Sequence, residues 1–215
     1  MSCAMLVLCL CACSGTKITY HQENNSYTDS KGNVYLHAPS CYEPVSYQSD
    51  KAYGSLTAGI GTFDLYAITD APVEGEWLTT ADCDVLYKEG AKLPTLQEFQ
   101  TDCIYICREG ESIHAFARVE TQQEIDALIK TYLEGESIPY PSRVATQSLR
   151  LRFASKAYSF LFYRLTYLEY ASDVIVYTTD ESGQEIETNY GKYFLFNRDD
   201  GRCVPVGDAL HKYVE

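Results

Sequence analysis

The chain has 215 residues, of which 46% are hydrophobic, and a formal net charge of −13. The apolar fraction predicts a folded core and excludes global disorder, and the length suits one sizeable domain or two small ones. The negative charge repels nucleic acid and anionic lipid headgroups, so the composition argues against both as partners.

Residues 1–12 carry no charge and end in Leu10-Cys11-Ala12-Cys13, which Ser14 and Gly15 follow. An aliphatic residue, two small residues and a cysteine resemble the lipobox of bacterial lipoproteins, in which the cysteine receives a diacylglyceryl group. The resemblance implies that 1–12 is a cleaved signal peptide and that Cys13 is the lipidation site. It also implies an extracytoplasmic protein held on the outer face of a membrane by its lipid.

The apolar segment lacks the basic start that a secretory signal usually has. We expect that the start codon is placed too late and that Met1 or Met5 lies inside the original apolar segment. The segment is too short to cross a bilayer, which takes about 20 apolar residues. The alternative interpretation is a buried N-terminal strand or helix, since Cys, Leu and Val are common in protein cores.

Residues 13–31 are mostly polar and predict a flexible tether between the lipid and a single folded domain at 32–215. Within that domain, short strands are predicted at 33–37 and 62–68, where apolar and polar residues alternate in part. Glycines between these two strands predict a mobile loop.

The main helix is predicted at 121–134. Thr121 and Glu124 have the spacing of a capping box, and Gly135 is expected to end the helix in a left-handed conformation. The apolar residues that recur at helical spacing are Ile125, Leu128, Ile129, Tyr132 and Leu133. They form one stripe, which we expect to cover a sheet.

Strand-like segments lie on both sides of this helix, at 112–119, 149–153, 159–171, 173–178, 192–197 and 203–206. A short C-terminal helix is predicted at 208–213, with Asp208 as its cap. The order of strands, helix, strands and helix shows no regular alternation. It predicts an α+β fold with a mostly antiparallel sheet, covered by the main helix and the short C-terminal helix.

The cysteines that would remain after signal cleavage and lipidation are Cys41, Cys83, Cys103, Cys107 and Cys203. Their odd number means that at least one is free or pairs between molecules. The chain has no C-x-x-C motif and no Cys/His spacing typical of zinc, so we predict neither a metal site nor a cofactor. A cysteine nucleophile would need a histidine brought to it by the fold. The candidates for such a pair are Cys41, Cys83, His37 and His114, and no local signature assigns a catalytic role to any of them.

Arg150 and Arg152 alternate with apolar residues and are expected on one face of a strand, with Lys156 beyond and Arg164 in the same sheet. One interpretation is a site for an anion or a carboxylate, which guanidinium groups bind in a bidentate way. The other is pairing with acidic residues on neighbouring strands.

Tyrosine is over-represented, with 19 residues against 8 Phe and 1 Trp. Tyr163, Tyr167 and Tyr193 belong to the C-terminal strands, where a tyrosine-rich sheet face could contact a protein or a carbohydrate. Tyrosines also fill sheet faces because of their strand propensity.

The sequence therefore predicts a lipid-anchored, extracytoplasmic, non-enzymatic binding or interaction module with a tyrosine-rich contact face. The alternatives are an extracytoplasmic hydrolase of an unrecognised family and an inhibitor or immunity-type protein. The expected partners are the membrane, through the N-terminal lipid, and a protein or carbohydrate, but no nucleic acid.

Overall fold

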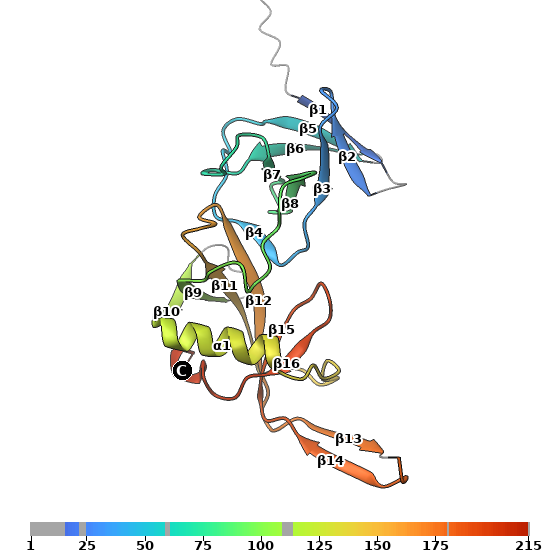
Figure 1. Ribbon diagram of the computed structural model, residues 1–215, viewed down its shortest axis with the longest axis vertical. Coiled ribbons are helices and arrows are strands. Elements are labelled where there is room, and N and C mark those ends of the chain that lie inside the picture. The colour runs from blue at the N-terminus through green and yellow to red at the C-terminus, as the bar shows by residue number, and fades with distance from the viewer. Residues whose placement is uncertain (1–15, 22–24, 59–60, 109–113, 180, 215) are drawn as a thin grey trace, which may run out of the picture.

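The computed structural model describes residues 16–21, 25–58, 61–108, 114–179 and 181–214. The predicted signal peptide and Cys13 lie outside these ranges. Figure 1 shows a small barrel close to the N-terminal end of the described chain and a larger sheet with one helix packed on it. A two-stranded ribbon projects from the far end of the sheet.

Seven short strands form a closed barrel in the order β1-β2-β3-β8-β7-β6-β5. They are β1 (Thr16–His21), β2 (Ser26–Asp29), β3 (Val34–His37), β5 (Gly54–Ala58), β6 (Gly61–Ala67), β7 (Trp77–Thr79) and β8 (Val85–Lys88). A parallel pairing of β1 with β5 closes the barrel, and the other neighbours are antiparallel. Gly54 suits this seam, because a Cβ atom there would lie 2.1 Å from the carbonyl oxygen of Thr16. The barrel interior is filled by Ile18, Tyr35, Leu56, Leu65, Leu78 and Leu86.

The second sheet is antiparallel and has the order β10-β9-β11-β12-β15-β16, with β4 paired to the start of β12. Its strands are β4 (Tyr42–Pro44), β9 (Cys103–Arg108), β10 (Ala115–Val119), β11 (Gln147–Ala154), β12 (Leu161–Glu169), β15 (Tyr193–Phe196) and β16 (Cys203–Pro205). The helix α1 (Gln122–Glu134) follows β10. The ribbon consists of β13 (Ile175–Thr179) and β14 (Glu185–Asn189).

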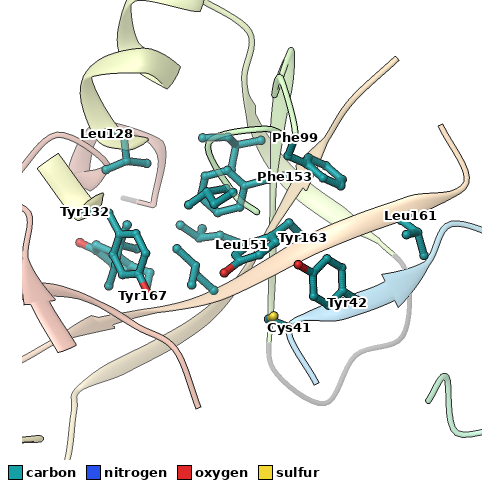
Figure 2. Close-up of a cluster of buried hydrophobic side chains, with 14 of the residues drawn as sticks. Cys41, Tyr42, Phe99, Leu128, Tyr132, Leu151, Phe153, Leu161, Tyr163 and Tyr167 are labelled. Carbon is teal, nitrogen blue, oxygen red and sulfur yellow. The ribbon is translucent and has the colours of Figure 1, made fainter. Parts of the chain in front are cut away.

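One face of this sheet packs against α1 and holds the main core. The buried residues of β11 on this face are Leu149, Leu151 and Phe153. Figure 2 shows this cluster of apolar side chains together with Leu128 and Tyr132 of the helix. Because strand residues alternate between faces, Arg150 and Arg152 point to the opposite side of the sheet.

The barrel and the sheet share a continuous packed junction. Trp77 of the barrel contacts Phe160, which directly precedes β12, with ring centroids 5.1 Å apart. Trp77 and Phe160 belong to the same buried cluster as the core under α1. The chain leaves β3 of the barrel and enters the sheet through β4. This passage places Glu43 of β4 against the arginine-bearing face of the sheet, opposite α1, while Tyr42 packs in the main core.

The predicted α+β class is wrong, because 44% of the chain is strand, 9% is helical, and seven strands form a closed barrel. The barrel strands have three to seven residues, which is too short for a clear alternation of apolar and polar residues. The predicted C-terminal helix at 208–213 is also wrong. It is a single 3-10 turn (His211–Tyr213), whose backbone hydrogen bonds join residues three apart.

The main helix is present at Gln122–Glu134, close to the predicted 121–134. Its ends differ from the prediction. Thr121 makes no side-chain cap hydrogen bond, and Glu124 instead accepts a hydrogen bond from the Tyr213 hydroxyl at 2.8 Å. Gly135 has a φ of −66° and is not left-handed. A Cβ atom at Gly135 would lie 2.4 Å from Val204, so close packing accounts for the glycine.

The polar segment assigned to a tether contains two strands of the barrel, β1 (Thr16–His21) and β2 (Ser26–Asp29). Asp29 organises the turn that follows them. Its carboxylate accepts hydrogen bonds from the backbone N–H groups of Lys31 and Asn33 at 2.9 and 2.8 Å. Ile18 is the one fully buried apolar residue of the two strands, and Ser26 and Asp29 are buried polar residues. With one buried apolar residue, the segment had too weak an apolar pattern to predict a strand.

Candidate functional site

The sheet face opposite α1 gathers arginines from neighbouring strands. The antiparallel register places Arg152 of β11 beside Arg164 of β12 and beside Tyr105 of β9. Arg150 lies two residues along β11, opposite Cys107. Paired residues of adjacent strands share a face, so three cationic side chains meet on one side of the sheet.

Glu43 of β4 lies at the centre of these arginines. Its side chain is only 7% exposed. It accepts hydrogen bonds from Arg152 Nε at 2.6 Å and from Arg164 Nη1 at 2.8 Å. The Arg150 guanidinium lies 3.4 Å from the same carboxylate. β4 pairs with β12 so that Glu43 lies opposite Phe162. This pairing places the carboxylate among the arginines.

The charges of this cluster do not balance. Burial opposes ionisation of Glu43, but the charges of Arg152, Arg150 and Arg164 outweigh it and hold the pKa of the carboxyl below its usual value. Three cations facing one carboxylate leave a net charge of about +2. The arginine side chains are 14–26% exposed, so part of each side chain remains accessible from solvent. We call Glu43, Arg150, Arg152 and Arg164 the arginine cluster.

A pocket of about 570 Å³ adjoins the arginine cluster, and Arg152 is part of its wall. Its apolar and aromatic lining comes from Pro44, Val45, Tyr47, Tyr105, Ala115 and Phe162. Its remaining lining residues are Ser46, Ser49, Cys83 and Cys107. The Arg152 guanidinium lies 5.5 Å from the centre of the Phe162 ring, and Phe162 meets Tyr105 edge to face at 6.0 Å. The wall of the pocket is therefore largely aromatic, and its edge at Arg152 is cationic.

The structure places the predicted tyrosine face inside the protein. Tyr163 is 8% exposed and Tyr167 is fully buried, and Figure 2 shows both within the cluster of core side chains. Tyr193 is half-buried and stacks on Tyr167, with ring centroids 6.3 Å apart. These three residues therefore belong to the core under α1 or to its edge. The prediction that they form an exposed contact face is wrong.

The candidate cysteine–histidine pairs gain no support from the geometry. In the described ranges no hydrogen bond joins Cys41 or Cys83 to His37 or His114. Burial raises the pKa of the Cys41 thiol to about 12, and the nearby Asp199 carboxylate adds to this effect. Burial also raises the pKa of Cys83. A nucleophile requires the thiolate, which both environments disfavour.

The described ranges show neither a disulfide nor a metal site. All five cysteines found there are free, and these ranges hold no group of three or more His, Cys, Asp or Glu side chains that could bind a metal ion. Within them, the helices fall short of the length and apolar character needed to span a membrane.

No protein-family model, curated protein or solved structure matches the chain. The candidate site is therefore interpreted from its own geometry and charge. Of its members, the sequence indicated Arg150, Arg152 and Arg164 through their places in adjacent strands. Glu43 was missed, and the only signal for it was one acidic residue between Tyr42 and Pro44 in a short strand.

Proposed function

We propose that this protein is a non-enzymatic binding module that takes a small organic anion, a carboxylate with an aromatic or apolar body, at the arginine cluster and its pocket. The observation that carries the proposal is the excess of positive charge beside an aromatic pocket in a chain whose net charge is −13. Guanidinium groups bind carboxylates with charge-assisted, directional hydrogen bonds.

Size and lining support the same ligand class. Ligand pockets usually enclose about 300–1,000 Å³ and combine apolar walls with few polar groups, and the volume here is about 570 Å³. Tyr105 and Phe162 offer ring faces and edges to a planar group, while Arg152 marks the charged end. Glu43 holds the arginines in place without neutralising them.

The test compares two ligands of nearly the same shape, of which one carries a carboxylate and the other a neutral amide. Isothermal titration calorimetry with phenylacetate and with phenylacetamide is expected to show binding of the acid about tenfold or more tighter, because only the acid completes charge-assisted hydrogen bonds. Equal affinities for the two ligands would remove the proposed charge recognition.

Arg150→Gln gives a matched protein variant for this site. Arg150 is the most exposed of the three arginines and has the longest separation from Glu43, so its loss is expected to spare the fold. Phenylacetate affinity should fall about tenfold. Arg143→Gln removes the same charge from a surface arginine that bonds to Ser172, and it should leave affinity unchanged. Equal losses in both variants would show a general charge effect.

We further propose that the module is extracytoplasmic and lipid-anchored through Cys13, as the resemblance to the lipobox implies. In bacterial cells expressing the full chain, intact mass spectrometry of the detergent-extracted product is expected to show removal of 1–12 and addition of a diacylglyceryl group. Cys13→Ala should leave an unlipidated product that no longer fractionates with membranes. A wild-type product of unprocessed mass would contradict the anchor and leave the ligand proposal standing.

A further inference from the structure

The ribbon formed by β13 and β14 projects from the sheet as a separate two-stranded element (Figure 1). Among the described strands, β13 and β14 pair only with each other. The ribbon is held at its base, where Val174 is buried and Val176 packs against a cluster that includes Phe194. Two-stranded ribbons are at best marginally stable alone in water. A ribbon that projects from the sheet therefore indicates a binding partner that packs against it.

One face of the ribbon is divided into an apolar strip and an acidic strip. The register places Tyr177 opposite Glu187 and Thr179 opposite Glu185, so these side chains share a face with Ile175. Tyr177 is 58% exposed and Ile175 is 42% exposed. The apolar residues lie on β13 and the two carboxylates lie on β14.

The ribbon carries charge of one sign only. The segment 173–191 contains no Lys or Arg. Glu185 and Glu187 are exposed, and neither forms an ion pair with a described residue. Acidic residues also repel nucleic acid, anionic lipid and a second copy of the same ribbon. By charge complementarity, the partner that fits this face of the ribbon is a basic protein segment.

We propose that this face of the ribbon docks an extended Arg-x-Arg segment of a partner protein. Glu185 and Glu187 are two residues apart on one strand, and such positions lie about 7 Å apart on the same side. Arginines two residues apart in an extended segment have the same spacing, so each guanidinium can meet one carboxylate. The arginine facing Glu187 also comes close to the Tyr177 ring, where a cation–π contact adds to the attraction.

This proposal is independent of the arginine cluster, which lies on the body of the sheet and prefers anions. It names a separate surface with the opposite charge preference. A partner that binds the ribbon would leave the pocket beside Arg152 open to its own ligand.

The test uses two labelled peptides with the same composition. One contains Arg-Val-Arg between Gly-Ser flanks, and the other contains Arg-Arg-Val, which puts the arginines on opposite sides of an extended strand. Fluorescence anisotropy with the full chain at low salt is expected to show about tenfold tighter binding of the Arg-Val-Arg peptide. The double variant Glu185→Gln/Glu187→Gln and the single variant Tyr177→Ser should each lose most of this preference.

The control variant Asp50→Asn/Glu74→Gln removes two exposed carboxylates from the barrel end of the chain and should keep wild-type affinity. Equal binding of the two peptides would overturn the proposed spacing. Equal loss in the ribbon double variant and in the control would overturn the ribbon as the site and leave only general attraction to an acidic protein. Circular dichroism of each variant checks that folding is retained, and the exposed position of these side chains makes loss of folding unexpected.

Discussion

Glu43→Gln is expected to lower the free energy of unfolding by about 3–5 kcal/mol, since removing one partner of a buried charge cluster leaves the other charges uncompensated. Glutamine keeps the shape of the side chain, so the loss reports charge rather than packing. Arg152 and Arg164 would lose the carboxylate to which they donate at 2.6 and 2.8 Å. Urea denaturation at pH 7 and low ionic strength measures the effect.

The control for this variant is Glu98→Gln, which breaks the exposed ion pair between Lys92 and Glu98. Exposed pairs contribute little to stability, so its unfolding midpoint should stay close to that of the wild type. Added phenylacetate or sulfate should stabilise Glu43→Gln more than the wild type, because an anion replaces the missing carboxylate. A variant as stable as the wild type would show that the arginines do not need Glu43.

The same carboxyl predicts a pH dependence of stability. The folded-state pKa of Glu43 lies below its ordinary value of 4.5, so the folded state holds fewer protons at this group than the unfolded state. Its contribution is therefore complete above about pH 5 and is lost as the pH falls through the folded pKa. Glu43→Gln should reduce the difference in stability between pH 7 and pH 4, and an unchanged difference would assign the acid sensitivity to other groups.

Tyr167→Ala is expected to lower the free energy of unfolding by about 3–5 kcal/mol, as for other large aromatic side chains removed from a core. Tyr167 is fully buried between the sheet and α1. Its hydroxyl has no hydrogen-bond partner among the described residues. Tyr167→Phe should therefore be as stable as the wild type or slightly more stable, since it removes an unpaired polar group.

These two variants separate the core role of Tyr167 from the contact face expected from the sequence. Thermal and urea unfolding of both variants, with Tyr177→Ser as an exposed control, measures the difference. The control should change stability little, because Tyr177 is 58% exposed on the ribbon. A Tyr167→Ala variant with wild-type stability would place this side chain outside the core.

Long and regular segments were predictable from the sequence. The helix follows from its apolar stripe, and the alternation of arginine and apolar residues in β11 correctly predicted one buried and one polar face. The strands predicted at 33–37, 62–68, 112–119, 149–153, 159–171, 173–178, 192–197 and 203–206 each overlap a strand of the structure. Local periodicity was strongest in β11 and in the helix, because each of them lays one apolar face on the main core.

The barrel and the complete arginine cluster were not predictable in this way. β1 places only Ile18 fully inside the barrel, and its pairing with β5 joins residues far apart in the sequence. Glu43 reaches Arg152 from 109 residues away. The tyrosines were misassigned because strand propensity and surface recognition favour the same residue type, and only the position of α1 decides which face is buried.

The start of β1 at Thr16 limits how far from the membrane an anchored barrel would lie. Three residues of fully extended chain reach at most about 11 Å, so a lipid on Cys13 would moor the barrel directly at the bilayer surface. In Figure 1 the ribbon lies at the opposite extremity from β1. An anchored molecule would therefore present the acidic ribbon on the side away from the lipid headgroups, where a partner protein can reach it.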